Sequence, residues 1–386
     1  MKEINPLEFF EGEVYGRLPE ACANPVWFEE AEPEWVVMDG KAVRRRVRVC
    51  FRGEGGVGSF PVVAFIPREP SLRDGGKICP SFLPKESSLR DDGEMNTTAV
   101  AGFVYVNIFD RERVLDMEGR VRTESWPVAD IVERGFAAIG FNHWDVVPDE
   151  ECAYAAGAYK VLAPDVSKRT AESGGALAMW AWACSKVMDW VETEPRLDAK
   201  RMAVIGHSRG GKTALWCGAN DKRFAMVVSD KSGCAGAKLN ELDLPWSEQI
   251  ERISSFFPYW FCGNFQKYAG RDRVMPVDQD ALLALIAPRL LYVSSAAGDA
   301  WAGPLGEYEA CRRAAASGSG GIDKILRHPV GMALSVEGDG ELFPVGLPEA
   351  GTALHEGRVG YHIRPGEHGL RVDDWARFMD FFEKKM

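Results

Sequence analysis

The chain has 386 residues, of which 46% are hydrophobic, and its 12 Trp and 20 Phe are typical of a globular protein with a large core. Its formal net charge of −11 at pH 7 argues against a nucleic-acid-binding surface and against a basic membrane-binding patch. No stretch approaches the roughly 20 apolar residues that a transmembrane helix needs, so we expect neither nucleic acid nor a membrane among its partners.

The N-terminal sequence MKEIN lacks the apolar core of a secretory signal peptide, which predicts a cytoplasmic protein. The alternative is a secreted or periplasmic protein whose signal has been removed. Nine cysteines are scattered without a CxxC pair, and their odd number leaves at least one unpaired within the chain. We expect buried thiols, with a disulfide or two as the alternative.

Residues 1–33 predict an irregular N-terminal arm with short helical stretches. Three runs rich in Val and aromatic residues follow, at 35–38, 43–51 and 60–66. Turn signals separate them, Asp39-Gly40 and the glycine-rich residues 53–58, as in antiparallel hairpins. The polar, turn-rich residues 67–99 predict a surface insertion.

From residue 100 onward, apolar runs of strand length alternate with helical patterns. The predicted strands are 100–109, 135–142, 201–205, 224–229, 289–295 and 361–363. The predicted helices are 173–193, one beginning at 212–219, 247–257, 278–286 and 372–384. This alternation predicts an α/β protein with one mostly parallel sheet covered by helices on both faces. Because no linker interrupts the pattern, we expect a single domain over 1–386.

Residues 202–213, MAVIGHSRGGKT, match two motifs at once. As G-x-S-x-G, the segment is a nucleophile elbow, a sharp turn between strand and helix that lifts the Ser208 hydroxyl above the sheet. As G-x-x-x-x-G-K-T, it is a phosphate-binding P-loop, and Asp230 follows the next predicted strand. Both motifs require a strand, a turn and a helix.

The position of the segment favours the elbow, because a P-loop usually follows the first strand of its domain and several predicted strands precede this one. In an α/β-hydrolase fold, a three-layer sandwich, the triad follows the order Ser, acid, His. Asp299 follows the strand predicted at 289–295, and His368 lies in a loop before the last predicted helix. The sequence therefore predicts Ser208, Asp299 and His368 as a catalytic triad.

A serine hydroxyl needs a base that takes its proton and returns it to the leaving alcohol, while the acid fixes and stabilises the imidazole. His207 adjoins the nucleophile but points wrongly for a base. The remaining histidines lack the C-terminal loop context: His143, His328, His355 and His362.

Residues 134–382 resemble the glucuronoyl esterases of carbohydrate esterase family 15, and especially the bacterial members. The matching segments are 206–216 (GHSRGGKTALW), 223–236 (RFAMVVSDKSGCAG), 257–265 (FPYWFCGNF), 287–301 (APRLLYVSSAAGDAW) and 361–375 (YHIRPGEHGLRVDDW). The N-terminal third matches poorly apart from VYG at 14–16.

The resemblance implies a metal-free and cofactor-free esterase that cleaves the ester between 4-O-methyl-glucuronic acid on xylan and lignin alcohols. It implies that Ser208 attacks the uronate carbonyl and that Arg209 holds the oxyanion through its backbone N–H and its guanidinium. It implies that Lys212 and Glu248 bind sugar hydroxyls and that Trp301 lines the sugar site. The structural alternatives are solvent-exposed side chains for Arg209, Lys212 and Glu248 and core packing for Trp301.

Lys231 departs from the family pattern, because fungal and some bacterial relatives carry the triad acid at this position. A cation there cannot orient His368 and would disfavour its imidazolium. The acid role therefore falls on Asp299, as in other bacterial members, with Asp230 as the alternative. Three competing functions remain: an acetyl xylan esterase or other carbohydrate esterase, a nucleotide-binding P-loop protein, and a carbohydrate-binding protein with a degraded site.

Overall fold

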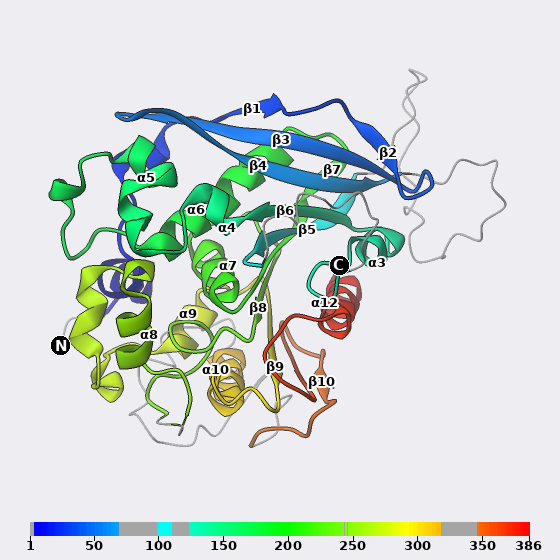
Figure 1. The fold of residues 1–386 in the computed structure, drawn as a ribbon. Coiled ribbons are helices and arrows are strands. Elements are labelled where there is room, and N and C mark those ends of the chain that lie inside the picture. Colours follow the sequence, from blue (N-terminus) through cyan, green and yellow to red (C-terminus); the bar gives the residue numbers. More distant parts are fainter. Residues whose placement is uncertain (1–3, 69–98, 110–122, 243, 245, 318–345) are drawn as a thin grey trace.

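The computed structural model describes residues 4–68, 99–109, 123–242, 244, 246–317 and 346–386 (Figure 1). The insertion expected at 67–99 lies outside the described residues except at its two ends, and so does His328. The described helices include none that is long and apolar enough to cross a membrane. Eight of the nine cysteines fall in the described ranges, and all eight are free thiols.

Eleven strands of the described chain form one sheet, in the order β1-β3-β4-β6-β5-β7-β8-β9-β11-β10, with β2 paired to β3. The first strands are β1 (Trp27–Glu30), β2 (Trp35–Val37), β3 (Ala42–Gly53), β4 (Gly56–Pro67), β5 (Val100–Asn107) and β6 (Ala137–Asn142). The others are β7 (Leu197–His207), β8 (Met226–Asp230), β9 (Leu290–Ala296), β10 (Ala353–Leu354) and β11 (Val359–Arg364).

The sheet is antiparallel at its N-terminal edge and parallel in its centre. β2, β3 and β4 pair antiparallel as the hairpin signals predicted, and β4 joins β6 antiparallel. From β6 through β5, β7, β8 and β9 to β11 every pairing is parallel. Because parallel strands end at one edge, the loops that follow β7, β9 and β11 open on the same side of the sheet.

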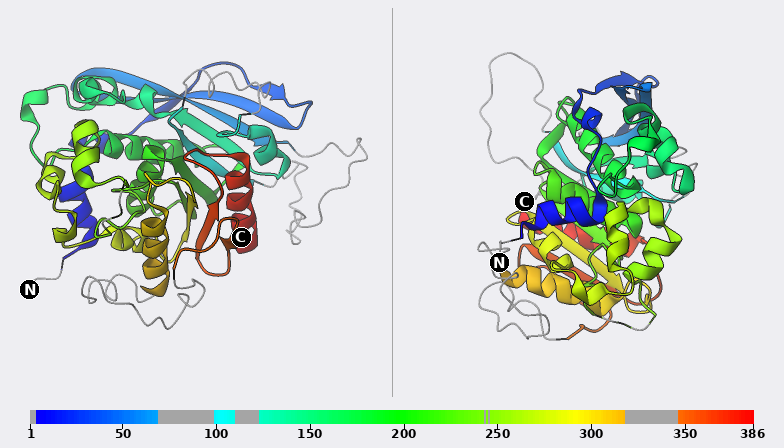
Figure 2. Two further views of the ribbon diagram at one scale, coloured as in Figure 1. Left: turned by 60° about the horizontal axis from the view of Figure 1, so that its bottom comes forward. Right: turned by 90° about the vertical axis from the view of Figure 1, so that its left-hand side faces the viewer.

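Helices cover both faces, which gives the three layers of an α/β-hydrolase fold (Figures 1 and 2). Residues alternate between the faces along each strand, so Val104 and Val106 of β5 belong to one core while Phe103 and Tyr105 belong to the other. The first core includes α6 (Ala176–Val191), α7 (Arg209–Asn220), α9 (Gln279–Ala284) and α10 (Pro304–Ser317). The second includes α3 (Val128–Glu133) and α12 (Val372–Lys385).

The described chain also has shorter α-helices. They are α1 (Pro6–Phe10), α4 (His143–Val146), α5 (Gly157–Leu162) and α8 (Ile250–Phe256). The helix predicted at 247–257 is wrong for its first three residues, because α8 begins only at Ile250. Trp246 has a left-handed φ of 66°, and the N–H of Glu248 donates to the carbonyl of Trp301 at 2.7 Å, so Glu248 lies in a loop.

The N-terminal arm packs against the elbow helix. The ring of Tyr15 stacks on that of Trp216 in α7 with centroids 4.5 Å apart, and its hydroxyl donates to the carbonyl of Ala235 at 2.8 Å. A Cβ on Gly16 would lie 2.6 Å from the Cα of Gly174, so only glycine fits there. These contacts give the isolated VYG match a structural basis.

Candidate active site

Ser208 occupies a strained turn between β7 and α7. Its φ of 56° and ψ of −123° are unusual for a residue with a side chain, and they are the hallmark of a nucleophile elbow. A Cβ on Gly206 would lie 2.0 Å from the carbonyl oxygen of Gly210, so the chain can cross itself here only with glycine at 206. The N–H of Ser208 donates to the carbonyl of Asp230 at 2.8 Å, which ties the turn to β8.

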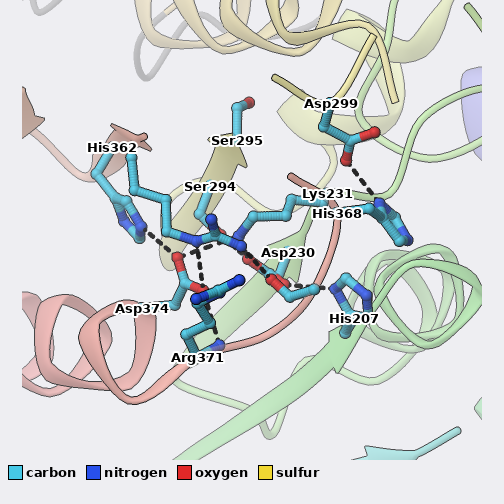
Figure 3. Close-up of polar contacts among 12 residues, drawn as sticks. His207, Asp230, Lys231, Ser294, Ser295, Asp299, His362, His368, Arg371 and Asp374 are labelled. Atoms are coloured by element: carbon cyan, nitrogen blue, oxygen red, sulfur yellow. Dashed lines mark hydrogen bonds and ion pairs between the residues drawn. The ribbon is translucent and has the colours of Figure 1, made fainter. Parts of the chain in front are cut away.

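His368 and Asp299 form a hydrogen-bonded pair, with His368 Nδ1 2.6 Å from Asp299 Oδ2 (Figure 3). Burial alone would raise the pKa of Asp299, but the hydrogen bond and charge of His368 lower it below its ordinary value. The ionised carboxylate can only accept, so Nδ1 carries a proton, and in the neutral imidazole the free lone pair is then on Nε2. The His368 side chain is 38% exposed, whereas that of Asp299 is 2% exposed.

Backbone contacts between two loops bring this pair together. The N–H of Ala297 donates to the carbonyl of Arg364, and the N–H of Gly298 donates to the carbonyl of Gly366, each at 2.9 Å. These bonds extend the parallel pairing of β9 with β11 beyond the strand ends. The guanidinium of Arg364 then holds the histidine loop by donating to the carbonyls of Pro365, Glu367 and Gly369.

His207 forms a second His–Asp pair, with its Nδ1 2.6 Å from Asp230 Oδ2. Its ring contacts those of Phe109 and His368, with centroids 5.5 Å and 4.5 Å away. Because His207 precedes Ser208 directly, this contact brings the exposed imidazole of His368 close to the elbow. The acid considered as the alternative, Asp230, therefore contacts His207, and Asp299 contacts His368.

Lys231 points away from His368 into a buried group of charges (Figure 3). Its Nζ lies 2.5 Å from Asp230 Oδ1 and 3.1 Å from Asp374 Oδ1. Asp374 also contacts His362 Nε2 at 2.8 Å and Arg364 Nε at 3.2 Å. Burial opposes ionisation of both carboxyls, but the charge of Lys231 leads the effects that lower the pKa of Asp230 and of Asp374.

The three residues predicted to bind sugar form one connected group. Lys212, 1% exposed, donates from Nζ to Glu248 Oε2 at 2.8 Å and also to the carbonyl of Ser232. Trp301 Nε1 donates to the other oxygen, Glu248 Oε1, at 3.0 Å. Trp301 itself is 37% exposed, so neither core packing for Trp301 nor full solvent exposure for Lys212 and Glu248 describes this group.

Arg209 opens α7, so its backbone N–H has no partner within the helix and lies at the positive end of the helix dipole. Its guanidinium extends to Asp149, with Nε 2.5 Å from Oδ2, in an ion pair without hydrogen-bond alignment. Asp149 also accepts from Trp260 Nε1 at 2.6 Å. Sequence analysis did not single out these partners: Asp149 lies outside the matching segments, and Arg364 and Asp374 lie in the matching segment 361–375 without an assigned role.

A nucleophile elbow, a His–Asp pair at the carboxyl edge of a parallel sheet and an open helix N-terminus together define a serine carboxylic-ester hydrolase of the α/β-hydrolase fold. A family model described as "Glucuronyl esterase, fungi" matches residues 121–317, slightly more than half of the chain. The protein therefore belongs to the glucuronoyl esterase family.

Individual relatives extend the similarity over nearly the whole chain. A carbohydrate esterase from an unknown prokaryotic organism is 29% identical over 98% of this chain and 83% of its own length. A 4-O-methyl-glucuronoyl methylesterase from Podospora anserina is 31% identical over 46% of this chain and 38% of its own length. Among solved structures, a glucuronoyl esterase from Solibacter usitatus has a TM-score of 0.75 and 25% identity, covering 98% of this chain and 90% of its own.

Proposed function

We propose that this esterase hydrolyses esters of 4-O-methyl-glucuronate on glucuronoxylan and releases the alcohol. The family and the name of the Podospora anserina relative support a uronate ester as substrate. The observation that carries the proposal is the Lys212–Glu248–Trp301 group, because a paired ammonium and carboxylate beside a half-exposed indole suit the hydroxyls and the ring face of a sugar.

In the proposed acylation step, Ser208 Oγ attacks the ester carbonyl while His368 Nε2 takes its proton. Asp299 stabilises the imidazolium through the 2.6 Å hydrogen bond at Nδ1. The oxyanion receives a hydrogen bond from the free N–H of Arg209 at the start of α7. As the tetrahedral intermediate collapses, His368 gives its proton to the leaving alcohol oxygen and the uronyl group remains on Ser208.

In the proposed deacylation step, water takes the place of the alcohol. His368 removes a proton from the water, whose oxygen attacks the acyl carbonyl, and the proton then returns to Ser208 Oγ as the uronic acid leaves. All groups that move protons in this cycle belong to the chain itself.

Steady-state kinetics on two esters test the substrate class. We expect a higher kcat/KM for benzyl glucuronate than for 4-nitrophenyl acetate, because only the glucuronate can use the Lys212–Glu248–Trp301 group. Preference for the acetate would instead favour an acetyl-removing carbohydrate esterase. Ser208→Ala should abolish hydrolysis of both esters, and full activity in that variant would reject the serine mechanism.

A matched pair of variants tests the sugar contacts. Trp301→Phe keeps an aromatic ring but removes the indole N–H that orients Glu248, so KM for benzyl glucuronate should rise about tenfold, the effect of roughly one lost hydrogen bond to a charged group. The activity on 4-nitrophenyl acetate should change far less. Trp246→Phe is the control, since Trp246 is 77% exposed on the same segment as Glu248. Equal losses on both esters would contradict a sugar-binding role for Trp301.

A further inference from the structure

Four charged residues that the proposed mechanism does not use form a buried charge cluster that contacts His207. They are Asp230, Lys231, Arg364 and Asp374. Asp230 and Asp374 are fully buried and Lys231 is 1% exposed, so water screens their charges little. Two anions and two cations balance, provided that the histidines in contact with them stay neutral.

His207 connects this cluster to the proposed catalytic base. Nδ1 of His207 is 2.6 Å from Asp230 Oδ2, and its ring centroid is 4.5 Å from that of His368. During turnover His368 becomes an imidazolium. A proton on His207 would place a second cation in ring contact with it, and two like charges at this distance oppose each other strongly.

Two opposing influences decide whether His207 holds an extra proton. Asp230 attracts one, because its carboxylate accepts a hydrogen bond from Nδ1 and would stabilise a positive ring. Burial is the largest influence and lowers the pKa of His207, with the charges of His368 and Lys231 acting in the same direction. Lys231 also forms an ion pair with the other carboxylate oxygen of Asp230, because its Nζ lies 2.5 Å from Oδ1.

We propose that Lys231 is a positioning residue that acts through His207: by neutralising Asp230, it keeps His207 an uncharged ring against the catalytic imidazole. The proposal rests on the roles proposed above for Ser208, His368 and Asp299. It assigns a use to a buried cation that the proposed triad, whose acid Asp299 lies on another loop, does not itself require.

The charged and titratable groups around His207 and its carboxylate partner Asp230 come from five parts of the fold. They are Tyr105 of β5, Asp230 and Lys231 at the end of β8, Asp299 after β9, His368 after β11, and Asp374 of α12 with its partners His362 and Arg364. Removing only the Lys231 charge leaves Asp230 and Asp374 against Arg364 alone. Because Arg364 pairs with Asp374, the carboxylate left without a cation is that of Asp230, which contacts Nδ1 of His207.

The pH dependence of kcat/KM for benzyl glucuronate tests this inference in wild type, Lys231→Met and Lys231→Arg. We expect the acidic limb of Lys231→Met to move up by about one pH unit and to steepen, since two histidines now take up protons. At alkaline pH, where both rings are neutral, most of the wild-type rate should return. Lys231→Arg should restore the wild-type limb, and Lys186→Met, which removes a lysine paired with Asp189 on α6, is the control.

A folded Lys231→Met enzyme with an unchanged acidic limb, or with the same loss at every pH, would overturn the inference. Lys231→Gln replaces it if the methionine variant does not fold, because its amide still donates to Asp230 without a charge. Independently, ¹⁵N-histidine NMR of the wild-type enzyme should show His207 remaining neutral throughout the pH range of the acidic limb, and protonation of His207 within that range would also overturn the inference. Activity that survives in Ser208→Ala would instead reject the proposed function.

Discussion

Two His–Asp pairs lie side by side at the carboxyl edge of the sheet. They differ in how far their side chains are exposed to solvent. The His207 and Asp230 side chains are 2% and 0% exposed, so no substrate can reach them. The His368 side chain is 38% exposed, and its contact with Asp299 uses only Nδ1. Of the two pairs, only the second has a solvent-exposed imidazole, as the proposed catalytic base requires.

Asp299→Asn should lower kcat on benzyl glucuronate by about 10³–10⁴-fold, because an amide that donates to Nδ1 would hold His368 in the wrong tautomer. The fold should survive the nearly isosteric change, which circular dichroism would check. Asp198→Asn is the control, as Asp198 pairs with Arg201 in a partly exposed ion pair. An Asp299→Asn enzyme within tenfold of wild type would place the triad acid elsewhere.

The sequence predicted the residues that motifs and chain order can identify. Ser208 stood in a motif, and Asp299 and His368 followed in the order that an α/β-hydrolase requires. The contacts of Lys231 with Asp374 and of Arg209 with Asp149 join residues distant in the chain, so no local pattern signalled them. The site roles themselves stay predictions until the variants are measured.

The junction of β7 and α7 depends on close backbone contact. Gly206→Ala should destabilise the protein by about 1–3 kcal/mol and abolish activity, because the new methyl group would overlap the carbonyl of Gly210. Denaturant unfolding and ester hydrolysis measure the two effects. Gly12→Ala is the matched control, since a Cβ at Gly12 meets nothing within 4 Å.

If Gly206→Ala were as stable and active as Gly12→Ala, the turn at Ser208 could not be the tight elbow described here. A stable but inactive Gly206→Ala enzyme would show that the elbow governs the nucleophile without limiting the stability of the fold.

Elements with strong apolar runs were predicted, and elements without them were missed. β5, β6, β8 and β9 are buried on both faces and read as continuous apolar segments. α10 escaped prediction because its alanine-rich sequence PLGEYEACRRAAAS has little helical periodicity. β1 escaped within the N-terminal arm, because its four residues gain strand structure only by pairing with β3.

The stability of the whole molecule should depend on pH through Glu307. This residue of α10 is fully buried, hydrogen-bonded to Ser295 Oγ at 2.7 Å and to the N–H of Gly233 at 3.1 Å. Burial raises the pKa of Glu307 from 4.5 to about 7. The folded state therefore holds a proton that the unfolded state has lost between these pH values, so stability from this group falls as pH rises through that window.

Glu307→Gln resembles the protonated side chain and removes this dependence. Its free energy of unfolding should match that of wild type near pH 4, below the unfolded pKa, and exceed it by up to about 3 kcal/mol near pH 8. Urea unfolding at both pH values measures the difference, with Glu309→Gln on the same helix as control. A difference that does not grow with pH would show that Glu307 ionises freely in the folded protein.

The fold class, the parallel centre of the sheet and the hairpins at its edge were all predicted from the alternation of apolar runs, and the structure confirms them. The packing of the N-terminal arm on α7 was not predicted. It depends on the stacking of Tyr15 on Trp216, residues some 200 positions apart, and the spacing of hydrophobic residues does not signal such a contact. The similarity to the prokaryotic carbohydrate esterase covers 98% of the chain and therefore includes that arm.

Covalent labelling distinguishes this account from its rivals. A fluorophosphonate probe followed by peptide mass spectrometry should modify the peptide that contains Ser208, and the label should disappear in Ser208→Ala and weaken greatly in His368→Ala. An enzyme that still hydrolyses benzyl glucuronate while Ser208 stays unlabelled would contradict the account.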